Sequence, residues 1–160
     1  MRVLLQGVTL VGQVTTDLLS LQCAEGPGVE HHQVIGVGLL KEVCGLCFDD
    51  NGVLYVAGRE GVARFRPDPA QNGIPSLFAG FLCRSVHAQD GAPVGDGAVM
   101  LPAAAKDVSY SNGVFVVSAH EYAWDSSPAG LWVMDAQGTL LKHINTKVMD
   151  NPTYLALRQF

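Results

Sequence analysis

The pair Cys44-x-x-Cys47 is the first feature of this sequence that suggests chemistry, because two thiols at this spacing occur in redox and zinc sites. No second pair at zinc-ligand spacing is present, since Cys23 and Cys83 stand alone. On an extended strand, positions i and i+3 point to opposite faces, so the two thiols are expected to diverge. We therefore interpret these cysteines as small buried hydrophobic residues.

The histidines form no recognisable site either. His31 and His32 follow Glu30, but neighbouring residues of a strand face apart, so a shared metal ion is not expected. The remaining histidines are His87, His120 and His143. None of them has the helical i, i+4 partner that zinc motifs use, and the chain has no Gly-x-Ser-x-Gly elbow or phosphate loop. Motifs alone predict no catalytic residue and no cofactor.

The elements that must position any site are short β-strands. Of the 160 residues, 48% are apolar and 16% are charged, and glycine (18) and proline (8) fit short strands joined by tight turns. No amphipathic pattern of helical length is present. The sequence therefore predicts one all-β domain. The net charge of −5 argues against a nucleic-acid partner, because phosphate binding requires a basic surface.

A repeated motif organises these strands. The runs Cys44–Gly58 and Asp107–Ser118 each place an apolar stretch, then Asn-Gly, then a second apolar stretch. The pairs Asn51-Gly52 and Asn112-Gly113 predict tight type I′ hairpin turns. The expected strands are Val3–Leu5, Val8–Val14, Leu18–Cys23, Gln33–Val37, Val43–Phe48, Val53–Ala57, Val62–Arg66, Ile74–Phe78, Asp107–Tyr110, Val114–Ser118, Leu131–Met134 and Thr139–Ile144.

Grouped by this repeat, the chain forms three four-stranded antiparallel units and a remainder. The units span approximately residues 1–40, 42–80 and 105–145, and the remainder is a lone first strand at residues 152–157. Residues 81–104 show little periodicity and are expected to form a long loop. Such units cannot bury their own faces and have to stack on neighbours, so the blades of a β-propeller are the most natural arrangement.

Residues 40–160 resemble known propeller repeats. The segments Phe78–Gly80, Gly95–Pro102 and Asn112–Val117 look like the linker and hairpin pattern of NHL repeats. The segment Gly130–Leu141 also resembles blades of the gluconolactonase/regucalcin-like propellers. The resemblance implies a β-propeller of which this chain supplies about three blades. Blade motifs are structural, so they leave the chemistry open.

The two families imply different functions. The NHL resemblance, which we favour, implies a binding or scaffold module without catalytic residues. The gluconolactonase resemblance implies a hydrolase of lactones or esters that uses calcium or another divalent metal to polarise the carbonyl and activate water. Its implied ligands are Glu42, Asp107 and Asn151, near the starts of successive first strands. A third interpretation is a propeller fragment without independent activity.

A candidate partner-binding loop begins at His120. It contains Tyr122 and Trp124, and aromatic side chains on loops are enriched at protein interfaces. The alternative is that Trp124 packs back on a strand edge. About three blades also fall short of the ~4–8 that close a propeller ring. We therefore expect a protein partner or self-association, with the ring left open or completed by a second copy.

No targeting signal is recognisable. Gln6 and Thr9 interrupt the first apolar stretch, and no apolar segment approaches the ~18 residues of a membrane span. The Asn151-Pro-Thr match to a glycosylation site is blocked by its proline. These features favour a cytoplasmic protein that does not bind membranes.

Overall fold

The structure of the chain is a computed structural model. It describes residues 2–5, 8–15, 18–24, 30–36, 38–71, 74–86, 98–120, 129–145 and 155. For the residues before Ile35 it describes the backbone, and the burial of side chains is described from Ile35 onward. Within these residues the chain consists of β-strands and one short 3-10 helix, Pro69–Gln71. The all-β prediction is therefore confirmed. No helix in the described ranges is long and apolar enough to cross a membrane.

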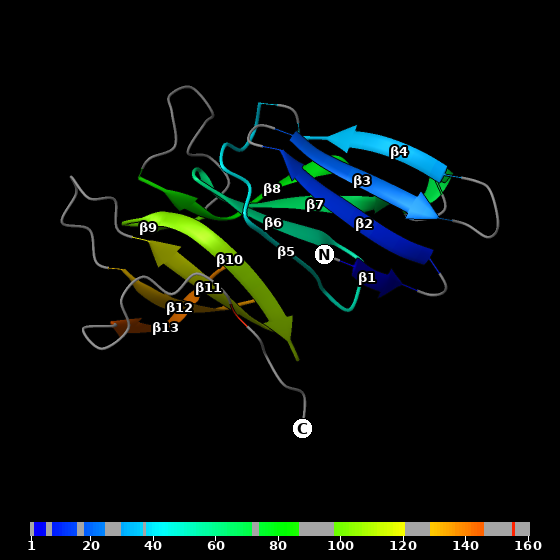
Figure 1. The fold of residues 1–160 in the computed structure, drawn as a ribbon. Coiled ribbons are helices and arrows are strands. Elements are labelled where there is room, and N and C mark those ends of the chain that lie inside the picture. Colours follow the sequence, from blue (N-terminus) through cyan, green and yellow to red (C-terminus); the bar gives the residue numbers. More distant parts are fainter. Residues whose placement is uncertain are drawn as a thin grey trace.

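The strands form three open sheets in which neighbouring strands follow the order of the chain (Figure 1). The N-terminal sheet contains β1 (Arg2–Leu5), β2 (Val8–Thr15), β3 (Leu18–Ala24) and β4 (Glu30–Ile35). The middle sheet contains β5 (Gly45–Phe48), β6 (Leu54–Gly58), β7 (Gly61–Asp68), β8 (Ile74–Ser85) and β9 (Val99–Leu101). The C-terminal sheet contains β10 (Ala104–Ser111), β11 (Val114–His120), β12 (Gly130–Asp135) and β13 (Leu140–Asn145). Neighbouring strands are antiparallel except for the parallel pair β8 and β9.

The twelve strands expected between residues 3 and 144 are present, with differences at their ends. The lone first strand expected at residues 152–157 lies outside the described residues except for Leu155, which is not part of a strand. The correction concerns the segment after Ile74, where β8 continues to Ser85 although residues 81–104 were expected to be loop. Strand β9 was not expected either. The pairing of β7 with β8 shifts register at three places. Each shift moves the following side chains to the other face, which removes the alternation by which a strand is recognised.

Both Asn-Gly hairpins are present, but they use different turns. Asn112 (φ 50°) and Gly113 (φ 80°) both have left-handed backbone and join β10 to β11 by the expected two-residue turn. In the first hairpin only Gly52 (φ 75°) is left-handed, and Asn51 is not, so the type I′ prediction is wrong there. Asp49 instead closes a longer loop, because its carboxylate accepts two N–H groups of the turn.

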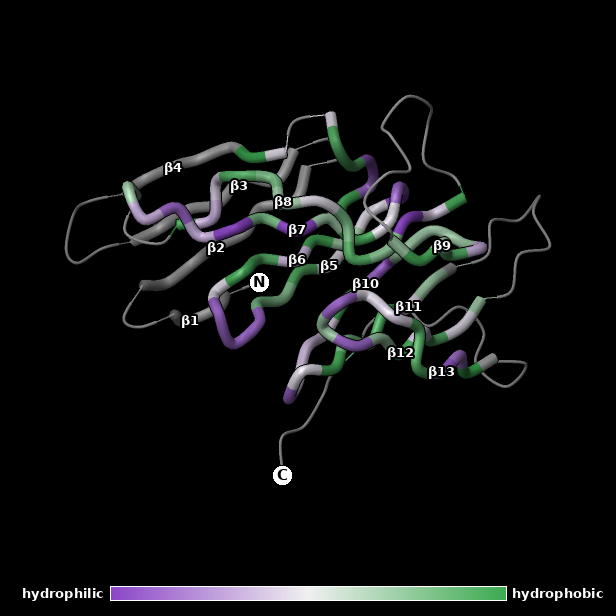
Figure 2. Tube along the Cα trace, turned by 180° about the vertical axis from the view of Figure 1, so that it is seen from behind, coloured by the Kyte–Doolittle hydropathy of each residue, from purple (hydrophilic) through white to green (hydrophobic). Residues whose placement is uncertain are grey.

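The middle sheet is buried on both faces, and its side chains alternate between two cores. Figure 2 shows the strands of the middle sheet running between the N-terminal and C-terminal sheets. On β6, Tyr55 and Ala57 face the C-terminal sheet, whereas Leu54 and Val56 face the opposite core. The core shared with the C-terminal sheet also contains Val62, Leu82, Cys83, Leu101, Ala103, Ala105, Val108, Phe115, Val117, Ala119, Trp132 and Met134. The opposite core also contains Ile35, Leu40, Val43, Leu46, Ala63, Phe65 and Phe81. Two successive sheets therefore stack through an apolar layer.

Candidate functional site

The first strands of the middle and C-terminal sheets lie side by side. Strand β10 packs against β5 and β6. Asp107 lies against Gly45, and a Cβ atom at position 45 would be 2.7 Å from the Cα atom of Asp107. Any side chain at position 45 would therefore collide with β10. A β-bulge between Ala105 and Asp107 shifts the register of β10 at this point.

Asp107 also connects β10 to the C-terminal part of the chain. Its Oδ1 atom accepts the N–H of Val108 at 2.9 Å, and its Oδ2 atom accepts the N–H of Leu155 at 2.7 Å. The hydroxyl of Ser109 donates to the C=O of Leu155 at 3.5 Å. Burial raises the pKa of Asp107 above its ordinary value, and the N–H groups of Leu155 and Val108 oppose this rise by stabilising the carboxylate.

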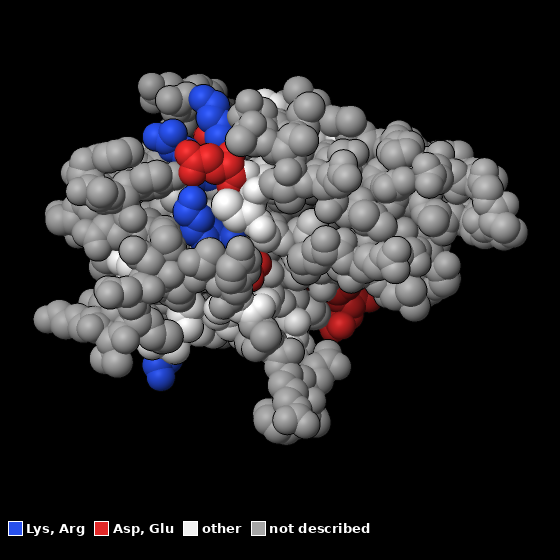
Figure 3. All heavy atoms as spheres, in the orientation of Figure 1, with Lys and Arg blue, Asp and Glu red and all other residues white. Residues whose placement is uncertain are grey.

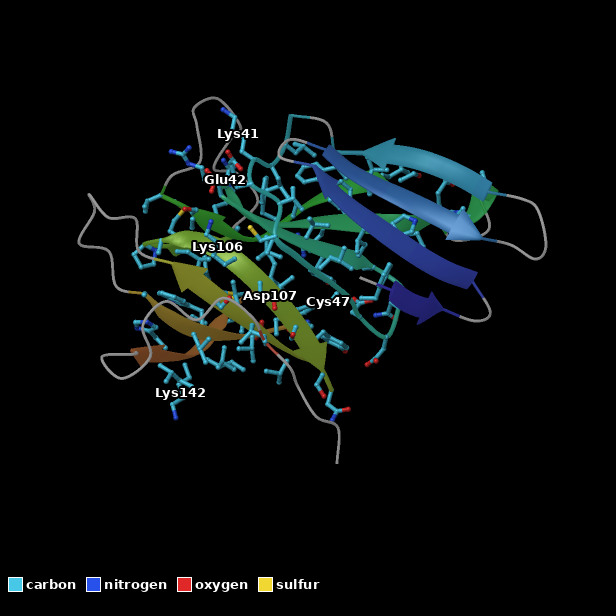
Figure 4. All side chains as sticks on the ribbon, viewed as in Figure 1. Lys41, Glu42, Cys47, Lys106, Asp107 and Lys142 are labelled. Atoms are coloured by element: carbon cyan, nitrogen blue, oxygen red, sulfur yellow. The ribbon has the colours of Figure 1, made fainter. Side chains whose placement is uncertain are left out.

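Glu42 lies between the middle and C-terminal sheets and has a left-handed backbone (φ 50°). Its carboxylate lies 3.2 Å from the Nζ atom of Lys106 and 3.9 Å from the guanidinium of Arg59. Figure 4 labels Glu42 and Lys106. Lys106 belongs to β10, and Arg59 belongs to the turn between β6 and β7. The carboxylate therefore links the two sheets. A left-handed residue other than glycine persists only where its surroundings hold it in place.

The turn between β6 and β7 also fixes the residue before Glu42. The N–H of Lys41 donates to the Oε2 atom of the buried Glu60 at 2.6 Å, and the C=O of Lys41 accepts the N–H of Arg59 at 2.8 Å. Figure 3 shows the resulting cluster of mixed charge on one face of the molecule. Because both signs are present, we interpret this cluster as a contact between segments rather than as a basic patch.

The structure describes two of the three metal ligands implied by the gluconolactonase resemblance. Glu42 is engaged by Lys106 and Arg59, and Asp107 is engaged by main-chain N–H groups. Asn151 lies outside the described residues. Among the residues that the structure describes, no group of three or more His, Cys, Asp or Glu side chains could hold a metal ion. A calcium site at Glu42, Asp107 and Asn151 therefore stays a prediction.

The cysteines differ in burial, which corrects the expectation that they are all buried. Cys44 is exposed, since it precedes β5 instead of lying within it, and its thiol donates to the C=O of Glu42 at 2.7 Å. Burial raises the pKa of the half-buried Cys47 and of the buried Cys83 to about 12. These three thiols are free. With such pKa values Cys47 and Cys83 stay protonated at neutral pH, so neither is an activated nucleophile.

A second polar link joins the two sheets at their hairpin ends. The hydroxyl of Tyr110 on β10 donates to the Oδ2 atom of Asp50 in the β5–β6 loop at 2.7 Å. Within the middle sheet, the hydroxyl of Tyr55 donates to the Oδ2 atom of Asp49 at 3.3 Å. The rings of Tyr55 and Tyr110 lie 4.3 Å and 4.8 Å from the ring of Phe115, between centroids. This aromatic group connects the polar link to the apolar core.

Sequence reasoning missed the contacts that build this region. They are Glu42–Lys106, Asp50–Tyr110 and Leu155–Asp107, whose partners are 64, 60 and 48 residues apart. No local pattern predicts such a pair, because the partners are far apart in the sequence and Leu155 takes part through its main chain. Only the prediction that successive first strands are neighbours could have indicated them.

The loop expected to bind a partner lies outside the described residues at Tyr122 and Trp124, and the side chain of His120, the last residue of β11, is not described. The ring of His143 stacks on Trp132 with centroids 4.3 Å apart. Comparison with protein-family models, with curated proteins and with solved structures gives no match for this chain. Its function therefore has to be argued from the contacts described above.

Proposed function

We propose that this chain is part of a β-propeller of NHL type and serves as a protein-binding scaffold. The observation that carries the proposal is the position of the first strands, because β10 lies on β5 and Leu155 lies on β10. In a propeller, successive blades surround a common axis and stack through apolar faces. The burial of the middle sheet on both faces agrees with this arrangement.

The carboxylates at the sheet boundary support binding rather than catalysis. The negative charge of Glu42 is compensated by Lys106 and Arg59. A divalent ion bound at Glu42 would be repelled by these two side chains. Asp107 uses both oxygen atoms to accept main-chain N–H groups. These contacts give both carboxylates a structural role in holding segments together.

The alternative is a metal-dependent hydrolase of lactones or esters. It is favoured by Asp107, a half-buried carboxylate at a strand where the family resemblance implies a ligand. For this function Glu42 would have to leave Lys106, and Asn151 would have to approach Asp107. The scaffold requires neither change, which is why we prefer it.

A metal titration separates the two functions. We expect that millimolar calcium, magnesium or zinc leaves the melting temperature of the chain unchanged, and that lactones and esters are hydrolysed no faster than in buffer. An ion that binds the native state would raise the melting temperature. A rise that is lost in Asp107→Asn, together with hydrolysis that needs the same ion, would establish the hydrolase and reject the scaffold.

Light scattering tests the propeller itself. About three blades cannot close a ring of ~4–8 blades, so we expect purified protein to form species larger than the 17.0 kDa chain. A monodisperse monomer that unfolds in one cooperative transition would contradict the proposal that the chain needs a partner or a second copy.

A further inference from the structure

One N–H group of Arg64, on β7, is buried without an acceptor. The side chain is partly buried, and its Nε atom is shielded from solvent and has no hydrogen-bond partner within the described ranges. An arginine stays charged at neutral pH, so burying one of its donors without an acceptor is unfavourable. Arg84 on the neighbouring strand differs, because its guanidinium stacks over the ring of Phe81, 4.5 Å from the centroid. Arg64 therefore lacks a favourable contact that a ligand would supply.

The two cross-strand neighbours of Arg64 do not satisfy this donor. They are Tyr55 on β6 and Gly80 on β8. Cross-strand neighbours share a face of the sheet, so Arg64 lies on the face that Tyr55 presents to the C-terminal sheet. Gly80 has no side chain, and the hydroxyl of Tyr55 donates to Asp49 at 3.3 Å. Neither position therefore supplies an acceptor to the guanidinium.

Asp49 is the carboxylate whose charge acts on the same tyrosine as Arg64. Burial raises the pKa of Tyr55, the Asp49 carboxylate adds to this rise, and the positive charge of Arg64 opposes it. The Oδ1 atom of Asp49 accepts the N–H groups of Asn51 and Val53. Its Oδ2 atom accepts the hydroxyl of Tyr55. Asp49 is thus used by its own loop, and no carboxylate of the described residues forms an ion pair with Arg64.

A second arginine lies two residues further along β7. Alternate residues of a strand share a face, so Arg66 lies on the face of Arg64, about 6.6 Å along the strand. Arg66 is exposed, and its cross-strand neighbour Leu77 is 62% exposed. The two guanidinium groups therefore form a short basic pair with one partly buried member and one member in solvent.

We infer that Arg64 and Arg66 form a binding site for an oxyanion, that is, a carboxylate or phosphate group. The guanidinium carries several N–H donors in one plane, a geometry that matches the oxygen atoms of both groups. The ligand accepts the buried N–H of Arg64, and Arg66 adds a second positive charge from the exposed side. This site goes beyond the proposed scaffold, because it lies on the third strand of the middle sheet and not on the first strands that support that proposal.

The Nε–H group of Arg64 itself reports on binding. In the full chain labelled with ¹⁵N-arginine, its resonance is assigned as the one missing from Arg64→Lys. The chain is titrated at neutral pH with inorganic phosphate and separately with acetate, while sodium chloride keeps the ionic strength constant. We expect a saturable shift of the Arg64 resonance with at least one of the two anions. The Nε–H resonance of Arg84 is the internal control and should stay in place.

Variants measured by calorimetry test the specificity of the site. Arg64→Gln should weaken binding of the same anion about tenfold or more, as loss of a charge-assisted hydrogen bond predicts. The matched control is Lys142→Gln, because Lys142 is exposed on β13 and its replacement removes the same charge. This variant should bind the anion as the unaltered chain does. An equal loss of affinity in both variants would show that only net charge matters and would overturn the inference.

A further measurement needs no variant and keeps the test valid if Arg64→Gln does not fold. Phenylglyoxal modifies arginine side chains, and mass spectrometry of peptides gives the rate at each position. We expect the anion to slow modification of Arg64 and to leave that of Arg84 unchanged. Equal rates at Arg64 with and without the anion would contradict the site.

The two anions separate the two sources of the ligand. Binding of phosphate alone assigns a phosphate group, and binding of acetate alone assigns a carboxylate. Binding of both supports an oxyanion site that accepts either group. If the Arg64 resonance moves with neither anion, or if all arginine resonances move alike, the site does not exist.

Discussion

Ser118 shows at the level of one residue how a buried polar group lowers stability. Its hydroxyl is fully buried on β11 and has no hydrogen-bond partner among the described residues. Burying an unsatisfied hydroxyl costs free energy, so we expect Ser118→Ala to raise the free energy of unfolding by about 1 kcal/mol in urea denaturation. The control is Ser109→Ala, which removes a hydroxyl with a partner and should bring no gain. A loss of stability in Ser118→Ala would show that the hydroxyl is satisfied in solution.

The buried thiols predict how stability depends on pH. In the folded chain the pKa values of Cys47 and Cys83 are raised from 9.0 to about 12. As the pH rises above 9 the unfolded chain releases these protons and the folded chain keeps them, so stability falls until the folded thiols titrate near 12. The slope is about 1.4 kcal/mol per pH unit for each thiol. Urea denaturation at a series of pH values should show this fall, and Cys83→Ala should make it shallower. An unchanged slope in Cys83→Ala would contradict the assignment.

At the level of elements, two hairpin loops of the chain are closed by the same kind of hydrogen bonds. Asp49 and Asp135 each open a loop, accept two N–H groups of the turn, and are followed three residues later by a left-handed glycine. The glycines differ in their surroundings. A Cβ atom on Gly52 would meet open space, whereas one on Gly138 would lie 2.6 Å from the C=O oxygen of Leu82.

Replacing each of these two glycines by alanine should therefore lower the free energy of unfolding by different amounts. Gly52→Ala is destabilising only because alanine has to adopt a left-handed backbone, and we expect the free energy of unfolding to fall by about 1 kcal/mol. Gly138→Ala adds a collision with β8, so its loss should be larger, about 2 kcal/mol or more. Chemical denaturation of the two variants measures the difference. Equal losses would mean that the Gly138 loop moves away from β8 at little cost.

The sequence predicts most of these strands because they are short runs rich in β-branched and aromatic residues, bounded by turn residues. The Asn112-Gly113 turn is predicted fully, since both residues tolerate left-handed backbone. At Asn51-Gly52 the same pair is overruled by Asp49, whose carboxylate competes for the N–H groups of the turn. The far half of β8 was missed because its bulges disturb the alternation.

The candidate site was much less predictable than the strands. Two of its residues, Glu42 and Asp107, were selected from the sequence because the gluconolactonase resemblance implies metal ligands near the expected starts of first strands. Their partners, Lys106 and Leu155, were not selected, since pairing across 64 and 48 residues depends on how the sheets stack. A strand start indicates that a polar group will be near the boundary between sheets, but it does not indicate which charge it meets.

At the level of the whole molecule, the apolar layer between the middle and C-terminal sheets is the larger of the two cores among the described residues. Phe115 is fully buried in this layer and contacts the rings of Tyr55 and Tyr110. We expect Phe115→Ala to lower the free energy of unfolding by about 3–5 kcal/mol, measured by urea denaturation. The control is Leu141→Ala, because Leu141 is 57% exposed on β13 and should change stability by less than about 0.5 kcal/mol. Similar effects of both variants would show that the two sheets do not fold as one unit.

Because synthesis proceeds from the N-terminus, the middle sheet is complete before the strands that cover its second face exist. The face carrying Tyr55, Ala57 and Val62 then stays uncovered until residues 104–145 have been synthesised. At about 5–20 residues per second this interval lasts ~2–8 s on the ribosome. During it the nascent chain exposes an apolar sheet surface that other chains can bind. Slow codons within residues 104–145 lengthen this exposure and would lower the yield of native protein, whereas slow codons before residue 36 would not.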